Sequence, residues 1–481
     1  MAVSIHLHRT REHVPSESRA ARERRSATPS FRALDKDSPL NDLDLWGGIE
    51  CTVNRVGDTV FDQLAMSGHD ERIDDPDRIA ALGIRTVRYP ANWERIAPKG
   101  VCEWRWQDAR MERLAALGIE PVLHLLHHGS GPSGTSLIDP EFPDQFARFA
   151  GEVAGRYPWV SRFVPINEPV TTARFSTLYG LWYPHLRDIS AFFRAVWIQC
   201  RAIRLGMRAI RRVTPEAVCF LTDDYGRTHS TPRLRYQAEF ENARRWIALD
   251  LLFGRVTPHH PLWSHLRHAG LATRALLEMT ADPLENAVIG IDYYLTSERF
   301  LDHRLERYPP WSHGGNGRDT YADVEAVRVR AEGIDGVGSL LTEAWQRYGR
   351  PVAVTEAFLG APRPDQVRWM QTIWDAALIA RAAGAPVQSV TTWSLLGSYE
   401  WDSLVTRRNG TYEPGAFDLD APGHPETDLA AWIRATVAGD PQPVRHPGWW
   451  ETDTRFLYPP AFTSDPSQTT PAQGYHLLPA S

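Results

Sequence analysis

Two stretches of the sequence, FVPINEP (residues 163–169) and PVAVTEA (residues 351–357), decide the fold. Each is a short apolar run that predicts a buried strand, and the runs end at Glu168 and Glu356. Six similar runs occur along the chain, and helix-length amphipathic segments separate most of them. The eight runs cover residues 43–49, 84–90, 120–126, 162–168, 217–223, 287–294, 351–356 and 387–394. This alternation predicts an α/β fold, a single (β/α)8 TIM barrel.

The remaining segments set the domain organisation that we expect. Residues 1–40 are rich in Arg and Ser and predict a disordered basic tail, the barrel occupies 41–450, and 451–481 is a Pro-, Ser- and Thr-rich C-terminal tail. Residues 297–330 are rich in Arg, His, Gly and Tyr and predict a long loop without regular structure. No glycine fingerprint for dinucleotides follows an early strand, which argues against a doubly wound sheet.

Composition narrows the class of protein. The net charge is −6, so we expect no nucleic-acid partner, and no apolar stretch has the length of a membrane helix. The four cysteines show no metal or disulfide spacing, and the N-terminus lacks the apolar core of a secretory signal. These features predict a cytoplasmic protein whose partner is a small molecule. The sequence gives no oligomeric state.

The two strand-end glutamates predict a catalytic pair. Functional side chains of parallel barrels lie at the C-terminal ends of strands, so Glu168 and Glu356 should face each other across the mouth. Two facing carboxyl groups suit cleavage of a glycosidic bond, with Glu168 as general acid/base and Glu356 as nucleophile. Arg88 and Tyr294, also at strand ends, would keep Glu356 ionised. Asn167 would donate to a sugar 2-hydroxyl.

Three histidines near residue 127 raise the question of a metal. His124, His127 and His128 lie close in sequence. Because side chains alternate along a strand, we expect His124 and His127 to point to opposite faces. No other Cys/His set has ligand spacing, so we predict neither a metal nor a cofactor.

Aromatic and acidic residues after the last strand, in TTWSLLGSYEWDS, predict sugar contacts. A Trp face at Trp393 or Trp401 would stack on a sugar ring, and Glu400 would accept from two hydroxyls.

Several motifs together resemble glycoside hydrolase family 1, the β-glucosidase and β-galactosidase family. LGIRTVRYPANWERIAPKG (82–100) is similar to its G-x-x-x-x-R-[FY]-S-x-x-W-x-R-I-x-P-x-G signature, and PINEP and VTEAF to its acid/base and nucleophile motifs. GIEPVLHLLHHG, GIDYY and WSLLGSYEW resemble its third, sixth and eighth strand segments. The resemblance implies a retaining β-glycosidase without cofactor, with sugar contacts by His127, Asn167, Trp393, Glu400 and Trp401.

Departures from the family pattern concentrate where that family binds the sugar. Asn54 stands near the register of a Gln, and Asp292 replaces an Asn. Other family residues are replaced by His128-Gly129, Ala357-Phe358 and Gly397-Ser398. These changes suggest a different sugar. The C-terminal region resembles a divergent branch of which some members are fused to a dTDP-4-dehydrorhamnose reductase-like domain, although this chain shows no dinucleotide motif.

Three functional interpretations stay open at this point. The first is hydrolysis of a small β-glycoside, and the second is transglycosylation through the same double displacement. The third is a non-catalytic sugar-binding or scaffold protein that keeps the barrel.

Overall fold

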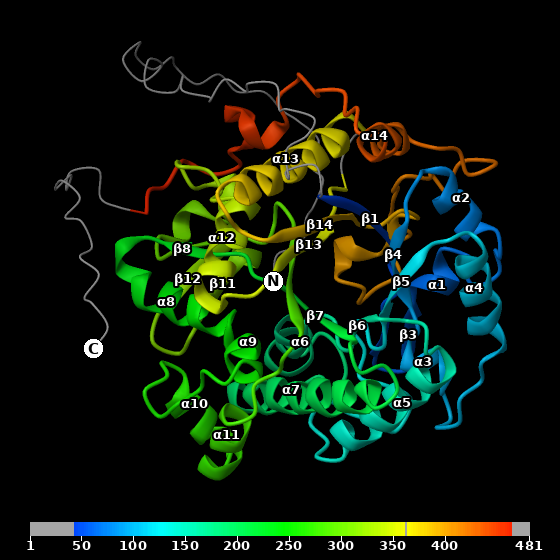
Figure 1. Ribbon diagram of the computed structural model, residues 1–481. Helices are drawn as coiled ribbons and strands as arrows, with labels where there is room; N and C mark the ends of the chain where they lie inside the picture. The colour runs from blue at the N-terminus through cyan, green and yellow to red at the C-terminus, as the bar shows by residue number, and fades with distance from the viewer. Residues whose placement is uncertain (1–42, 361–362, 464–481) are drawn as a thin grey trace.

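The computed structural model describes residues 43–360 and 363–463, and its centre is a closed barrel of eight parallel strands with helices around it (Figure 1). The predicted TIM barrel is confirmed, and each predicted strand is present. The barrel strands are β1 (Asp44–Gly48), β4 (Thr86–Pro90), β5 (Glu120–His124), β6 (Arg162–Val164), β7 (Val218–Asp224), β9 (Ala287–Tyr293), β13 (Val352–Ala357) and β14 (Val387–Thr392).

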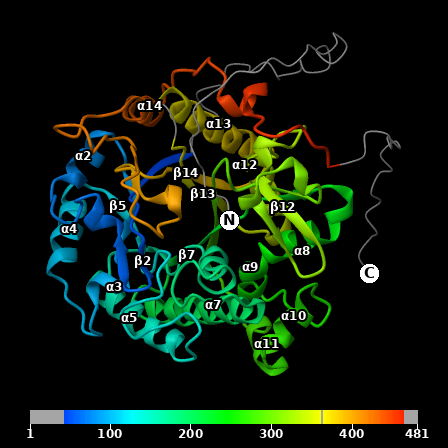
Figure 2. The same ribbon diagram turned by 180° about the vertical axis from the view of Figure 1, so that it is seen from behind.

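The helices lie outside the barrel in both views (Figures 1 and 2). Helices in the amphipathic segments between the predicted strands include α2 (Asp75–Ala81), α4 (Arg105–Ala116), α5 (Phe142–Arg156), α7 (Ile189–Arg211), α12 (Val337–Tyr348) and α13 (Arg363–Ala382). The remaining α-helices are α1 (Gln63–Met66), α3 (Trp93–Ile96), α6 (Pro169–Ala173), α8 (Arg235–Arg244), α9 (Ile247–Leu252), α10 (Trp263–His268), α11 (Thr273–Thr280) and α14 (Asp428–Val437).

Strand β1 closes the barrel. It pairs in parallel with both β14 and β4, so that Gly47 lies opposite Thr392 on one side and Val87 on the other. Side chains from six strands meet in an apolar cluster that is separate from the larger core between strands and helices. Residues from opposite sides of a barrel can meet only in its interior, so this cluster fills the barrel. Its members are Trp46, Val122, Val164, Phe220, Val288 and Ala353.

The segment 297–330 is not a structureless loop, and that prediction is wrong. It contains β10 (Arg299–Asp302), β11 (His313–Gly315) and β12 (Thr320–Glu325), which form a sheet with β8 (Thr228–Ser230) in the order β11-β12-β10-β8. The sheet has its own apolar cluster, which includes Phe300 and Val324. Short strands that depend on a distant partner such as β8 leave a weak local pattern in the sequence.

The C-terminal segment packs on this sheet region. Ala461 exchanges backbone hydrogen bonds with Val329 and Ala331, and it belongs to the same apolar cluster. The remainder of the predicted C-terminal tail and the predicted N-terminal tail lie outside the described residues.

Smaller pairs complete the fold: β2 (Val53–Val56) with β3 (Thr59–Asp62), and β15 (Ser398–Tyr399) with β16 (Tyr412–Glu413). Within residues 43–360 and 363–463, no helix has both the length and the apolar character that crossing a bilayer would require.

Candidate active site

The two predicted glutamates lie together at the C-terminal ends of the barrel strands. Glu168 follows β6, and Glu356 is the second-to-last residue of β13. Oxygens of these two carboxyl groups and of Asp292, in β9, lie within 4.8 Å of one another. All three side chains are buried. Three carboxyl groups therefore share one small volume away from bulk solvent.

Glu356 has the surroundings of an ionised group. The Nη1 atom of Arg88 lies 3.1 Å from its Oε1, and the Tyr294 hydroxyl donates to its Oε2. Burial raises the pKa of Glu356 to about 7, against the opposing effects of Arg88 and Tyr294. Arg88 and Tyr294 are thus placed where the sequence predicts them, on this carboxyl group.

Glu168 has a different environment. Among the described residues no cation donates a hydrogen bond to it, and His128 Nε2 lies 3.7 Å away. Burial, followed by the charges of Asp292 and Glu356, raises its pKa well above the usual range. Burial also lowers the pKa of His128 to about 3, so this imidazole is neutral. Glu168 is therefore set to hold a proton beside an ionised Glu356.

The backbone turn that presents Glu168 is fixed from β7. Glu168 has a φ of 46°, in the left-handed region that non-glycine residues seldom adopt. Directly after it, the Asp223 carboxylate accepts from the Val170 N–H (2.8 Å) and from the Thr171 hydroxyl (2.9 Å). A carboxylate that caps the first turn of α6 holds the glutamate in this unusual conformation.

Asn167 is oriented as a donor. Its Oδ1 accepts from Arg88 Nη2 at 2.8 Å and from the Thr222 hydroxyl at 2.7 Å. The two donors fix which side of the amide is oxygen. The Nδ2 group is buried and makes no hydrogen bond within the described residues. It is available to donate to a ligand, as the sequence predicts.

Asp292 is a further site residue. From the sequence it was noted only because it replaces an Asn of the family pattern. Its Oδ1 accepts from the Thr355 hydroxyl at 2.6 Å and lies 3.5 Å from Arg88 Nη1. Burial, then the charge of Glu356, raises the pKa of Asp292 well above its ordinary value. One guanidinium, Arg88, thus lies beside two of the three carboxyl groups, Asp292 and Glu356.

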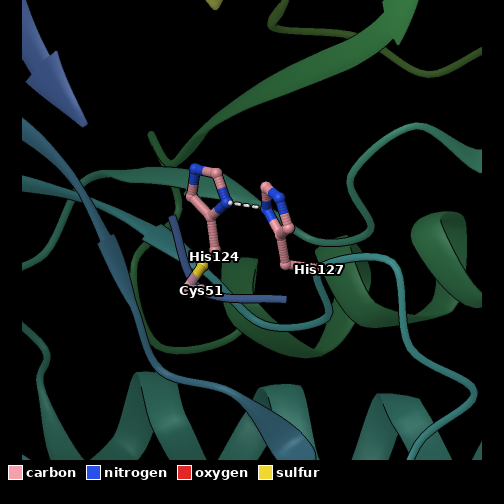
Figure 3. A group of neighbouring side chains, drawn as sticks. All are labelled: Cys51, His124 and His127. Carbon is pink, nitrogen blue, oxygen red and sulfur yellow. Dashed lines mark hydrogen bonds between the residues drawn. The ribbon is translucent and has the colours of Figure 1, made fainter. Parts of the chain in front are cut away.

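The histidines do not behave as predicted. His124 and His127 do not point to opposite faces: their rings stack 5.2 Å apart, and their Nδ1 atoms lie 3.0 Å from each other (Figure 3). The alternation rule fails because β5 ends at His124, so His127 is no longer on the strand. Cys51 lies beside the pair.

Glu50, for which the sequence carries no signal, also lies at the site. Its Oε2 accepts from Trp393 Nε1 at 3.3 Å, and its Oε1 lies 3.9 Å from His127 Nε2. Trp393 reaches β1 because residue 48 is glycine: a Cβ there would lie 2.3 Å from the indole Cε3. The predicted Asn54 is buried, and its Nδ2 donates to the Val405 carbonyl at 3.3 Å.

The residues predicted to contact a sugar after the last strand have different packing partners. Trp393 stacks on His127 with an interplanar angle of 12°, and Arg88 lies 4.7 Å from its ring centroid. Trp401 packs edge-on against His128, and its Nε1 is buried without a partner in the described part of the chain. The oxygens of Glu400 accept from the backbone N–H groups of residues 409 and 410, so sugar binding would use its remaining lone pairs.

Comparisons with known proteins agree with this architecture. No family model matches the chain. The chain is 22% identical to β-glucosidase A of Thermotoga maritima over 423 residues, which cover 80% of this chain and 90% of that protein. It is also 22% identical to β-glucosidase 4 of Oryza sativa subsp. japonica, over 82% of this chain and 90% of that protein. These relatives are β-glucosidases.

Solved structures show the same fold. The family 1 β-glucosidase from Thermotoga maritima superimposes with a TM-score of 0.67 at 17% identity, covering 83% of this chain and 98% of that one. The same enzyme in complex with deoxynojirimycin gives a TM-score of 0.65. At this identity the likeness is one of fold.

Proposed function

We propose that this protein is a retaining β-glycosidase of the family 1 type that hydrolyses a small β-glycoside without a cofactor. One observation carries the proposal: Glu168 and Glu356 oxygens lie within 4.8 Å of each other. Retaining glycosidases hold their two carboxyl groups about 5–5.5 Å apart, whereas inverting enzymes leave roughly 6.5–9.5 Å for a water molecule. The β-glucosidase relatives support the substrate class.

The roles of the two glutamates follow from their surroundings. Glu356, beside Arg88 and Tyr294, is the ionised group and attacks the anomeric carbon. Glu168 gives its proton to the glycosidic oxygen as the leaving group departs. The nucleophile's negative charge is consumed in the glycosyl-enzyme, so the pKa of Glu168 falls and Glu168 becomes the base that deprotonates the attacking water.

The neighbouring polar atoms would bind the sugar. Asn167 Nδ2, His127 Nε2, Trp401 Nε1 and Asn54 Oδ1 are buried and lack hydrogen-bond partners within the described residues. Buried polar atoms are rarely left unpaired without a functional reason. Sugar hydroxyls, which both donate and accept, would satisfy atoms of this kind.

Mass spectrometry of the intact protein tests the mechanism. The protein is incubated with 2-deoxy-2-fluoro β-glycosides that carry good leaving groups, because the fluorine slows hydrolysis of the glycosyl-enzyme. We expect one adduct, mapped by peptide digestion to Glu356, and its sugar identifies an accepted glycone. The Glu356→Ala variant should stay unlabelled, and the exposed Glu278→Ala variant should label normally.

Failure to label with any sugar, in a folded protein, would count against the retaining mechanism and favour a non-catalytic sugar-binding protein.

The compartment is part of the same proposal. Cys51, Cys102, Cys200 and Cys219 are all unpaired, which supports a reducing cytoplasm.

A further inference from the structure

A continuous series of hydrogen bonds runs from Arg88 through His124 to His127. Arg88 Nε donates to His124 Nε2 at 2.8 Å, and His124 Nδ1 lies 3.0 Å from His127 Nδ1 (Figure 3). All three side chains are buried. The contacts that surround them decide where each imidazole proton lies.

The direction of the series is set by Arg88. A guanidinium group has donors only, so His124 Nε2 must be the acceptor and carry no proton. Burial, then the charge of Arg88, lowers the pKa of His124 well below its usual value, so the ring is neutral and its single proton lies on Nδ1. His124 therefore donates to His127 Nδ1. His127 is also neutral because burial lowers its pKa, and its own proton must lie on Nε2.

The resulting donor faces an acceptor. His127 Nε2 has no hydrogen-bond partner within the described residues, and Glu50 Oε1 lies 3.9 Å away. That separation is too long for a direct hydrogen bond. Glu50 accepts hydrogen bonds from the Thr52 N–H at 2.9 Å and from Trp393 Nε1 at 3.3 Å, which fix its position. A hydroxyl group has one proton and two lone pairs, so it can accept from His127 while it donates to Glu50.

The tautomer matters for this pairing. If His127 carried its proton on Nδ1, both Nε2 and Glu50 would be acceptors. A single hydroxyl proton cannot satisfy two acceptors, and one buried group would stay unpaired.

A metal ion on Cys51, His124 and His127 is the alternative use of the same atoms. A metal-bound histidine normally donates its other ring N–H to a carboxylate or carbonyl. Here the other nitrogen of His124 accepts from a guanidinium instead. Burial, then the charge of Glu50, also raises the pKa of the Cys51 thiol well above its ordinary value, which disfavours the thiolate that a metal binds. The residues do not fit a metal.

We propose that His124 is a positioning residue: together with Arg88 it holds His127 in the Nε2–H tautomer, and His127 with Glu50 recognises one glycone hydroxyl as a donor–acceptor pair. This proposal rests on the proposed function for the identity of the ligand. The tautomer itself is a property of the protein without ligand, so the two can fail separately.

Nitrogen NMR tests the tautomer directly. Protein labelled with ¹⁵N-histidine is compared as native, His124→Asn and His124→Leu, and the His127→Gln spectrum assigns the signals of residue 127. The Asn amide can still donate to His127 Nδ1, whereas Leu fills the space without a donor. We expect the Nε2–H form in the native protein and in His124→Asn, and a mixture or the Nδ1–H form in His124→Leu. A native Nδ1–H form, or identical His127 signals in both variants, would overturn the proposal.

Kinetics with a glycoside identified by the labelling experiment test the consequence. We expect His124→Leu to lower kcat/KM by about tenfold or more, and His124→Asn to stay within a few-fold of native. With deoxy analogues, the deficit of His124→Leu should disappear for the one sugar that lacks the contacted hydroxyl. Equal deficits for every deoxy analogue would refute the donor–acceptor pair, and a general structural defect would lower all substrates and both variants alike.

Discussion

Two clusters of buried charged residues lie near the end of β9, and they are built on opposite rules. The site cluster is Arg88, Glu168, Asp292 and Glu356: three carboxyl groups lie together, and one guanidinium pairs with two of them. The buttress cluster lies where β8, the start of β10 and the start of α12 meet. It comprises Arg227, His229, Glu298, Arg330 and Asp335.

Every carboxylate oxygen of the buttress cluster has a donor. Glu298 accepts from His229 Nε2 (2.9 Å), the Tyr293 hydroxyl (2.7 Å) and the backbone N–H groups of residues 335 and 336 (both 2.9 Å). Asp335 is paired with Arg227 and Arg330. Burial would raise the pKa of Glu298, but these donors hold it below its usual value. The same burial leaves Glu168 with a raised pKa because no comparable set of donors surrounds it in the described part of the chain.

The difference teaches how to separate structural from catalytic acids in this fold. Matched charges stabilise a structure, whereas an unmatched buried carboxyl costs stability and is kept where proton transfer requires it. Depth of burial alone does not distinguish the two clusters.

The largest expected effect is loss of the acid in the site cluster. Glu168→Ala should lower kcat by roughly 10²–10⁴-fold for a glycoside with a poor leaving group, because that oxygen needs a proton. A leaving group as acidic as dinitrophenol needs no proton, so its glycosylation step should be nearly unaffected. Pre-steady-state bursts with the two substrates measure this contrast. Equal losses for both substrates would show that Glu168 is not the general acid.

Removal of the central acid of the buttress cluster should act on stability instead. Glu298→Ala leaves His229 and two backbone N–H groups without their acceptor, so we expect the free energy of unfolding to fall by about 3–5 kcal/mol. Urea unfolding followed by circular dichroism measures it, with the exposed Glu278→Ala as control. A loss below about 1 kcal/mol would mean that the cluster is not structural.

Asp292→Asn tests whether the third carboxyl group controls the acid. The charge of Asp292 is the second cause, after burial, of the raised pKa of Glu168. The neutral amide removes that charge, while Glu356, Asp223 and Asp224 continue to raise it. We therefore expect the alkaline limb of kcat/KM to move to lower pH. An unchanged limb would show that Asp292 is uncharged throughout.

The smallest effect should be a gain in stability from Glu168→Gln. The folded protein holds the Glu168 proton more tightly than the unfolded chain does. The stabilisation of the folded state by this proton is complete below the pKa of Glu168 in the unfolded chain, about 4.3. It is lost as pH rises towards the pKa of Glu168 in the folded protein. Relative to the native protein, the variant should therefore be more stable at pH 8 than at pH 4. Thermal melting at the two pH values, with Glu298→Gln as the opposite case, checks the sign.

Much of this arrangement could be predicted from sequence because strand-end chemistry is local. The eight apolar runs gave the barrel, and Glu168, Glu356, Arg88 and Tyr294 were expected at their ends. Glu50 was missed because it is a lone acid two residues beyond a glycine pair, with no periodic signal. Its importance comes from Trp393, which lies more than 300 residues away.

Other errors also come from contacts that are remote in sequence. The pairing of β10 with β8 joins segments separated by about 70 residues, so the sheet in 297–330 is hardly visible in its local pattern. For His124 and His127, β5 ends at His124, two residues before the predicted end of that strand at 126, and this reversed the expected geometry. Asn54 was predicted as a sugar contact from the family resemblance, and its amide Nδ2 donates to the Val405 carbonyl instead.

The pairing of β1 with β14 determines when the barrel can close during synthesis. Ribosomal synthesis delivers β14 about 340 residues after β1, and until then the partly made barrel exposes two strand edges. Trp393, which donates a hydrogen bond to Glu50, and Glu356 in β13 also come late. The candidate site is therefore incomplete until β13 and β14 have emerged, and a chain cut before β14 would present open strand edges to its neighbours.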